Sequence, residues 1–217
     1  PGRGHRVPLT MGQARAFSDQ PLALTMGDPA GIGPEIALKA WINRSKHHVP
    51  PFVLYADPQM LQHRARDLSL EVPIQTVASL DGVAALYQTA LPVFPAPLLE
   101  PAIAGNPTSA NAPAIIAAIE LAVADAAQSK VRAVVTNPIA KSVLYGAGFP
   151  HPGHTEFLAA LASKHWPGSR HQAIMMLASA DLRVVPLTIH VPLKDVPSLI
   201  TLTLITETVR ITWAALK

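Results

Sequence analysis

The stretch "LALTMGDPAGIGPEIALKAW", Leu22 to Trp41, decides the fold class. Its first five residues form an apolar run typical of a buried strand, and the residues from Glu35 to Trp41 have helical spacing. Gly27, Gly31 and Gly33 lie between these two patterns. A strand, a glycine-rich turn and a helix in this order predict one repeating unit of an α/β fold.

The same alternation continues along the chain. "FVLYA" (Phe52–Ala56) predicts a second strand, and a helix is expected near Gln59–Leu68. "VRAVVTNP" predicts a buried strand that ends at Asn137 and Pro138. Strands that alternate with helices predict an α/β fold with a substantially parallel sheet and helices on both of its faces.

The clearest helix is predicted for "NAPAIIAAIELAVADAAQ". Ile116, Ile119 and Val123 recur at spacings of three and four residues and would form one apolar face. Asn111 is a suitable N-cap, and Pro113 would stand in the first turn, where its missing N–H costs nothing.

Three further segments have weaker patterns. The prolines of "LPVFPAPLLEPAIAGNPTSA" (91–110) forbid a helix and predict an edge strand or a loop. "AIMMLA" and "LRVVPLTIHV" predict two more strands, which could pair with each other. "DVPSLITLTLITETVRITWAALK" is expected to form one long helix capped by Asp195.

The composition excludes several classes of protein. The 217 residues are 49% hydrophobic and 14% charged, which is typical of a globular chain and not of a disordered one. No uncharged apolar run approaches the length of a membrane span, so no membrane segment is expected. The net charge is only +3 and the basic residues are scattered, so nucleic-acid binding is not expected either.

The chain start and the cysteine content bear on the protein's location. Residues 1–20 are basic and irregular and lack the apolar stretch of a secretory signal, so we interpret them as a leader. The chain has no cysteine, which excludes disulfides and thiolate chemistry. This composition fits the cytoplasmic location that we expect.

In open α/β sheets, ligands bind beyond the carboxyl ends of the strands. The loop "GDPAGIGPE" stands at such a position, where glycines allow close approach of a ligand and a helix N-terminus favours an anion. Its spacing matches neither the dinucleotide fingerprint nor the P-loop. A tight structural turn would explain the glycines equally well.

"TNPIAK" follows another predicted strand. Thr136 offers a hydroxyl, and Lys141, placed one turn into the next helix, could anchor a phosphate or a carboxylate. An ordinary surface lysine remains the alternative.

"HPGHTEFL" is the third candidate. Thr155 can cap the following helix, and Glu156 in its first turn would complement the helix dipole. His154 would stand just outside the cap, either as a bystander or as one corner of a metal site. His190 ends a run of β-branched residues and would also lie at the carboxyl end of a strand, and imidazoles are common zinc ligands. His151 is a possible neighbour of this site.

Taken together, "TMGDPAGIGPEI", "VVTNPIAKSVLYGAGFPHPGHTEFLA" and "HVPLKDV" resemble the 4-hydroxythreonine-4-phosphate dehydrogenase family of vitamin B6 biosynthesis. The match runs in the same order from about Pro21 to the end of the chain. The resemblance implies a homodimer of two α/β/α domains, similar to isocitrate and isopropylmalate dehydrogenases, with the active site between the domains. It places a first domain at 21–135 and an incomplete second domain at 136–217.

The resemblance also implies the chemistry. NAD or NADP would take a hydride from 4-phosphooxy-L-threonine, and the β-keto acid would lose carbon dioxide to give 3-amino-2-oxopropyl phosphate for pyridoxal phosphate synthesis. A divalent metal (zinc, magnesium or cobalt) would be held by three histidines from both subunits, two of which map onto His154 and His190. Thr136 and Lys141 would hold the substrate, and Lys141 could assist proton transfer.

One part of the family pattern is absent from the sequence. The third histidine would lie in an Asn-Pro-His-Ala-Gly-Glu-like block, which does not occur here. We therefore expect a C-terminally truncated member of the family that is inactive alone. Two alternatives stay open: a related dehydrogenase for a four-carbon sugar-acid phosphate or a cyclic dihydrodiol carboxylate, and a non-catalytic remnant.

Overall fold

The computed structural model describes residues 20–167 and 172–216, so nearly all of the predicted leader lies outside the described residues. The chain divides into two compact units, Pro1–Gly168 and Ser169–Lys217, and each is described by itself. The division into domains at 21–135 and 136–217 stays a prediction.

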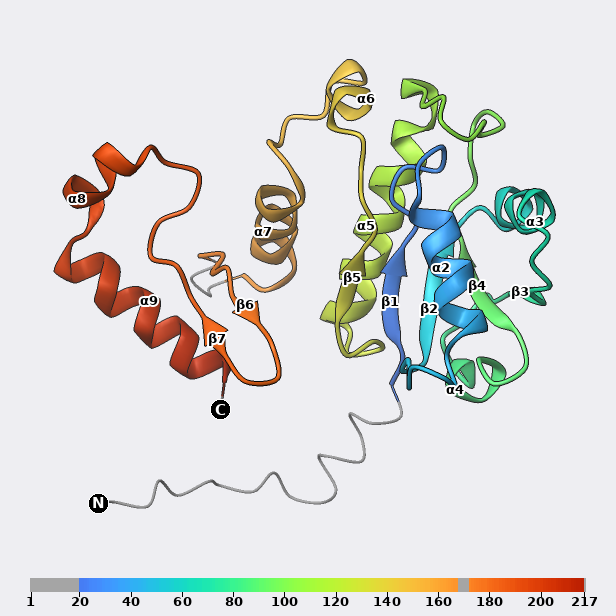
Figure 1. Ribbon diagram of the computed structural model, residues 1–217, viewed down its shortest axis with the longest axis horizontal. Helices are drawn as coiled ribbons and strands as arrows, with labels where there is room; N and C mark the ends of the chain where they lie inside the picture. The colour runs from blue at the N-terminus through green and yellow to red at the C-terminus, as the bar shows by residue number, and fades with distance from the viewer. Residues whose placement is uncertain (1–19, 168–171, 217) are drawn as a thin grey trace. The chain divides into compact units, whose positions relative to one another are not determined.

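The first unit is built on a five-stranded parallel sheet with the strand order β3-β4-β2-β1-β5 (Figure 1). Its strands are β1 (Leu22–Thr25), β2 (Phe52–Ala56), β3 (Ile74–Thr76), β4 (Leu91–Pro95) and β5 (Val134–Thr136). In β1, Leu24 is paired with Leu54 of β2 on one side and with Val135 of β5 on the other. The predicted parallel α/β fold is therefore confirmed.

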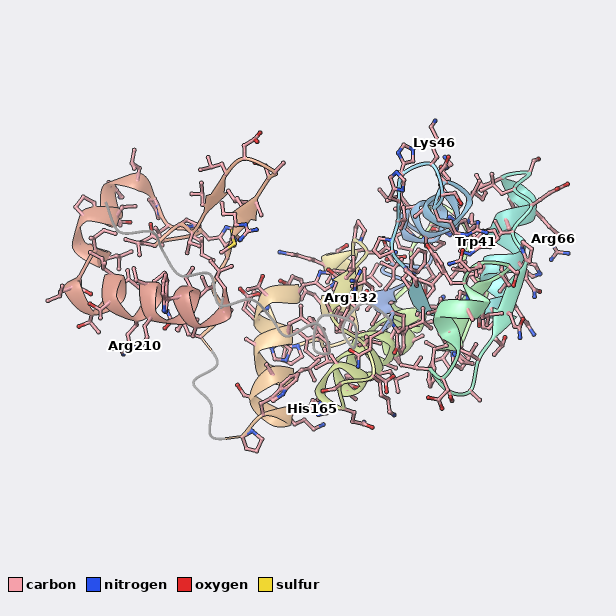
Figure 2. All side chains as sticks on the ribbon, turned by 90° about the horizontal axis from the view of Figure 1, so that it is seen from below. Trp41, Lys46, Arg66, Arg132, His165 and Arg210 are labelled. Carbon is pink, nitrogen blue, oxygen red and sulfur yellow. The ribbon has the colours of Figure 1, made fainter. Side chains whose placement is uncertain are left out.

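Helices cover both faces of this sheet, as the alternating pattern predicts. The helices of this unit are α2 (Gly33–Ile42), α3 (Pro58–Asp67), α4 (Val83–Leu86), the 3-10 turn η1 (Ser109–Asn111), α5 (Ala112–Ala127), α6 (Lys141–Gly146) and α7 (His154–His165). Helices α2 and α5 lie on opposite faces in both views (Figures 1 and 2). The reason is that the β1–β2 and β4–β5 crossovers run in opposite directions across the sheet, and right-handed crossovers then place their helices on opposite sides.

Helix α5 buries two faces instead of the single predicted one. Its alanines, with Ala118 fully buried, join the core formed around the sheet, where a small side chain allows close approach of the backbone. Ile115, Ile119 and Val123 instead pack with residues of α7 in a second apolar cluster, while Ile116 is only half-buried. The periodicity predicts the helix and its larger apolar side chains correctly: Ile116 packs against this second cluster, and Ile115 joins it at a buried position.

Asn111 does not cap α5 with its side chain, contrary to the prediction. Its Oδ1 accepts hydrogen bonds from the N–H groups of Leu99 and Glu100, both at 3.1 Å, and its Nδ2 donates to the Glu100 carbonyl at 3.0 Å. These long-range bonds fix the loop after β4, and they occupy the oxygen that a cap would need.

Strand β4 lies inside the sheet, so the edge-strand alternative predicted for 91–110 is wrong, whereas the loop alternative is correct for the residues that follow Pro95. The N–H of Leu91 donates toward the β3 side and that of Ala96 toward β2. Since N–H groups alternate along a strand, Pro92 faces β2 and Pro95 faces β3. The register with β2 begins at Val93, after Pro92, and the register with β3 ends at Val93, before Pro95. Each proline therefore lies outside the hydrogen-bonded ladder that it faces, where no N–H donor is needed.

Strand β5 is less buried than predicted. It lies at the edge of the described sheet, and the side chain of its central residue, Val135, is 43% exposed. The run of valines correctly indicates a strand, but a sequence pattern does not state whether both sides of that strand are paired.

The second unit contains β6 (Leu177–Ala178) and β7 (Arg183–Val184), followed by η2 (Leu193–Asp195), α8 (Val196–Leu199) and α9 (Leu202–Ala215). The two strands pair antiparallel, as the sequence suggested, but each has only two residues. The predicted single long helix is interrupted at Ile200, which is extended. The hydroxyl of Thr201 then accepts the Leu204 N–H at 3.1 Å and caps α9, whereas Asp195 makes no side-chain cap.

Among the described residues, one helical stretch, Ser109–Ala127, is long and apolar enough to cross a membrane. Half of it is buried in this fold, where α5 packs between the sheet and α7. Its composition is therefore that of a core helix.

Two tyrosines in the sheet core make the stability of the fold sensitive to high pH. Tyr55 is fully buried, and its hydroxyl donates to Asp125 Oδ2 at 2.8 Å. Burial first, and the Asp125 carboxylate second, raise the pKa of Tyr55 above its ordinary value of 10. Burial likewise raises the pKa of Tyr87, against the opposing charge of Arg44.

We expect Tyr55→Phe to flatten the alkaline loss of stability. A tyrosine whose pKa is raised in the folded state contributes stability that is complete below pH ~10 and is lost at higher pH, because only the unfolded chain ionises. Removing it should reduce the slope of the unfolding free energy by about 1.4 kcal/mol per pH unit above pH ~10, measured by urea unfolding. Tyr145→Phe, at an exposed position, is the control, and equal slopes in the two variants would contradict the prediction.

Candidate functional site

The candidate site is built where β1 and β5 end side by side. The two strands are parallel neighbours, and Thr25 is paired with Thr136 at their carboxyl ends. The β1–α2 loop (26–32) leads to one face of the sheet, and the β5–α6 loop (137–140) leads to α6 and α7 near α5 on the other face (Figure 1). Such a divergence of neighbouring connections is the position where α/β sheets bind ligands.

The glycines of the β1–α2 loop make room for the neighbouring loop. Gly27 has a φ of +70°, and a Cβ on it would lie 2.4 Å from the Pro138 carbonyl oxygen. A Cβ on Gly33 would lie 2.3 Å from the Met26 carbonyl oxygen and 3.0 Å from Asn137 Cβ. Contacts within the protein therefore explain both glycines, as the structural-turn interpretation of this loop requires.

Two polar residues of these loops were not identified from the sequence as site candidates. Asn137 is buried, and its Nδ2 donates to the carbonyls of Thr25 (3.0 Å) and Gly33 (3.3 Å). Asp28 is buried as well, and its Oδ1 accepts the Ala30 N–H at 2.8 Å, whereas its Oδ2 has no hydrogen-bond partner. Their position in the sequence could have identified them as site candidates, since each lies within three residues of a strand's carboxyl end.

Arg64, on α3, is a third residue that the sequence did not reveal. Its guanidinium donates to the carbonyls of Pro29 and Gly31, each at 3.1 Å, and its side chain is buried. The planar guanidinium thus holds two points of the β1–α2 loop with one side chain. No sequence spacing links α3 to this loop, because the contact depends on how α3 packs beside α2.

Lys141 and Thr136 flank the β5–α6 loop. Thr136 is the last residue of β5, and Lys141 is the first residue of α6, not one turn inside it as predicted. Lys141 is exposed, and its Nζ lies 3.5 Å from the position that a Cβ of Gly153 would occupy. The ammonium group therefore reaches the beginning of α7.

His154 is the first residue of α7, so the prediction that it lies outside the cap is wrong. Gly153 is the N-cap, and Thr155 makes no side-chain cap, while Glu156 lies in the first turn as predicted. Glu156 Oε2 is also 3.5 Å from the position of a Gly153 Cβ, the same distance as Lys141 Nζ. A lysine, a histidine and a glutamate thus gather at this helix start.

The surroundings of His154 favour its neutral form. Burial is the larger effect, and the positive charge of Lys141 is the second; both lower the pKa of His154 below its ordinary value of 6.5. Its Nε2 is buried and has no hydrogen-bond partner. The imidazole of His151 packs beside the rings of Phe149 and Phe157, with centroids 5.2 and 5.1 Å away, so it belongs to the aromatic cluster under α7.

His190 belongs to the second unit. It is exposed, has a φ of +57° and lies in a loop six residues beyond Val184, so the prediction that it ends a strand is wrong. Strand β7 is short, and the chain leaves it before the β-branched run is finished. Because His154 and His190 lie in different units, their assignment to one metal site stays a prediction.

The described residues do not by themselves form a complete metal site. Residues 20–167 and 172–216 contain no group of three or more His, Asp or Glu side chains arranged to hold a metal ion. The free Nε2 of a neutral His154 suits a metal ligand, but the neighbouring Lys141 ammonium repels a second cation. In this cluster Lys141 is the group that can bind an anion, while Glu156 contributes the opposite charge.

Known proteins are similar to this chain over most of its length. The family model described as "Pyridoxal phosphate biosynthetic protein PdxA" matches residues 48–217. A 4-hydroxythreonine-4-phosphate dehydrogenase of Methylorubrum extorquens is 50% identical over 206 residues, which are 93% of this chain and 58% of the relative. The corresponding protein of Xanthobacter autotrophicus is 46% identical over 191 residues, covering 88% of this chain and 54% of the relative.

Solved structures agree with this result. The crystal structure of a 4-hydroxythreonine-4-phosphate dehydrogenase from Burkholderia phymatum has a TM-score of 0.78 at 27% identity, covering 88% of this chain and 56% of that one. A terephthalate 1,2-cis-dihydrodiol dehydrogenase from Burkholderia xenovorans, with a TM-score of 0.62 at 24% identity, covers 88% of this chain and 55% of that one, and shares the fold. The chain thus spans between half and three fifths of the length of these proteins.

Proposed function

Because the chain belongs to the pyridoxal phosphate biosynthetic protein PdxA family, we propose that it serves the oxidation of 4-phosphooxy-L-threonine. The reaction removes a hydride to NAD or NADP and then carbon dioxide, and it yields 3-amino-2-oxopropyl phosphate. The observation that supports the substrate class is the gathering of Lys141 and His154 at the start of α7. An anionic substrate suits the Lys141 ammonium group and the backbone N–H groups at this helix start.

Three side chains have roles in this proposal. Lys141 binds a phosphate or carboxylate oxygen of the substrate through a charge-assisted hydrogen bond, and Thr136 supports it with a hydroxyl. The neutral His154 has an unpaired Nε2, which can hydrogen-bond to the substrate or move a proton. When bound, a divalent metal and the nicotinamide cofactor supply Lewis-acid polarisation and a hydride acceptor.

We propose His190 and His154 as metal ligands, with zinc, magnesium or cobalt as the ion. For His154 a second role, as a partner of the anionic substrate, is favoured by the Lys141 charge beside it. The two-domain architecture, the homodimer with a shared site and the cytoplasmic location are parts of the same proposal.

Binding measurements separate the two roles of His154. We expect His190→Ala and His154→Ala each to weaken Zn²⁺ binding at least tenfold, and His154→Ala also to weaken 4-phosphooxy-L-threonine binding about tenfold, the equivalent of one charge-assisted hydrogen bond. Calorimetric titration measures both, with the exposed His63→Ala as the control. Unchanged Zn²⁺ affinity in His154→Ala would contradict its assignment as a metal ligand and leave only the role in substrate binding.

The substrate class is tested by cofactor reduction with three compounds. Turnover or binding with 4-phosphooxy-L-threonine, lost in Lys141→Ala but kept in Lys164→Ala, supports the proposal. A response only to a four-carbon sugar-acid phosphate or to a dihydrodiol carboxylate would transfer the chain to a related dehydrogenase activity. Absence of both metal and substrate binding would identify a non-catalytic protein.

A further inference from the structure

The β1–α2 and β5–α6 loops are joined through one side chain. The Nδ2 of Asn137 donates to Thr25, at the end of β1, and to Gly33, at the start of α2. Because both carbonyls accept from the same atom, the hydrogen-bond network itself identifies that atom as nitrogen. Asn137 therefore supplies two polar links between segments that are more than a hundred residues apart in the chain.

The glycines opposite Asn137 fit its side chain closely. A Cβ on Gly27 would lie 2.8 Å from Asn137 Cβ, and a Cβ on Gly33 would lie 3.0 Å from the same atom. The next residue adds a third link, since the Pro138 carbonyl accepts the Asp28 N–H at 2.9 Å. The loop is thus held by contacts at two successive residues and has little freedom to shift.

Helix α6 begins directly after this anchored pair of residues. Only Ile139 and Ala140 separate Pro138 from Lys141, and Ile139 is partly buried against the α5–α7 cluster. Helix α6 has no side-chain cap of its own, because Ala140 stands at its N-cap. The position of the Lys141 backbone therefore depends on how the preceding loop is fixed.

We propose that Asn137 is a positioning residue, whose carboxamide fixes the β5–α6 loop on the β1–α2 loop and thereby places Lys141 at the start of α7. The link to catalysis rests on the proposed function, in which Lys141 binds the substrate. The positioning itself is a property of the folded chain and does not require a substrate.

Zero-length carbodiimide cross-linking tests this placement. Lys141 Nζ and Glu156 Oε2 both lie beside Gly153, so a Lys141–Glu156 cross-link should form in the native chain. The Lys130–Asp125 ion pair, with its atoms 3.3 Å apart, is an internal reference remote from the two loops. We expect Asn137→Ala to reduce the yield of the first cross-link relative to the second at least fivefold, as quantified by peptide mass spectrometry.

Two further variants distinguish positioning from general stability. Asn137→Asp keeps the size of the side chain but replaces the donor with an acceptor, so it should reduce the same ratio and serves as the test if Asn137→Ala does not fold. Val53→Ala, in the buried strand β2, lowers stability without touching either loop and should leave the ratio unchanged. An unchanged ratio in both Asn137 variants, or an equal fall in Val53→Ala, would overturn the proposal.

The consequence for binding is measured separately. Asn137→Ala should weaken 4-phosphooxy-L-threonine binding about as much as Lys141→Ala does, and the double variant should be no weaker than Lys141→Ala, because Asn137 acts through that lysine. Additive losses of substrate affinity in the double variant would contradict the inference that Asn137 acts through Lys141. If the wild-type chain does not bind the compound, the proposed function fails, while the cross-linking result still decides the role of Asn137.

Discussion

Replacing Gly27 with alanine is expected to lower the free energy of unfolding by about 3 kcal/mol or more. The residue has a φ of +70°, a conformation that costs an L-residue about 1–2 kcal/mol. The new Cβ would also lie 2.4 Å from the Pro138 carbonyl oxygen and 2.8 Å from Asn137 Cβ, both in the facing loop. Overpacking of this kind typically costs a further ~1–3 kcal/mol. Urea unfolding followed by circular dichroism measures the loss.

Gly82→Ala is a matched control for the backbone part of this effect. Gly82 has a φ of +73°, but no heavy atom lies within 4 Å of the position that its Cβ would take. Its substitution should therefore cost only the conformational part, about 1–2 kcal/mol. Similar losses of unfolding free energy in the two variants would show that the facing loop can move away from the new Cβ without destabilising the fold, contrary to the close packing described above.

Removing the Arg64 guanidinium is expected to have an effect of the same size. Arg64→Ala deletes two charge-assisted hydrogen bonds and leaves the carbonyls of Pro29 and Gly31 without their donors. Hydrogen bonds to charged groups contribute ~1.5–3 kcal/mol each, so a loss of about 3 kcal/mol is expected in urea unfolding. Arg64→Lys should recover only part of it, because an ammonium group lacks the planar fork that reaches both carbonyls.

Arg66→Ala provides the comparison within the same helix. Arg64 and Arg66 both stand in the last turn of α3, so each has the same favourable position relative to the helix dipole. Arg66 is exposed at the outside of the molecule (Figure 2), and its loss should change the unfolding free energy by no more than ~0.5 kcal/mol. If the two variants were equally stable, the buried hydrogen bonds of Arg64 would contribute nothing.

Much of the fold follows from local patterns. The strand, glycine turn and helix of 22–41 have the predicted order and nearly the predicted bounds, and so do β2, α3 and α5. These elements are predictable because hydrophobic periodicity reports burial directly. The errors concern relations between elements: β4 lies inside the sheet although it contains prolines, because each proline falls beyond the ladder that it faces.

The candidate site shows the same division. Thr136, Lys141 and His154 could be selected because each follows a strand or begins a helix. Asn111, by contrast, has the right residue type for a cap but uses its side chain for the loop at Leu99 and Glu100. Competing long-range hydrogen bonds of this kind cannot be predicted from the spacing of residues in the sequence.

What the sequence by itself determined is the α/β class, the alternation of strands and helices and the loops that follow the strands. These properties depend on period and on turn chemistry, which act over a few residues. Only the tertiary structure decided the strand order and the pairing of Thr25 with Thr136. It also showed that Gly27 and Gly33 lack side chains where Asn137 packs against them. The physical reason is that these contacts join segments about a hundred residues apart, and steric fit between such segments is set by packing.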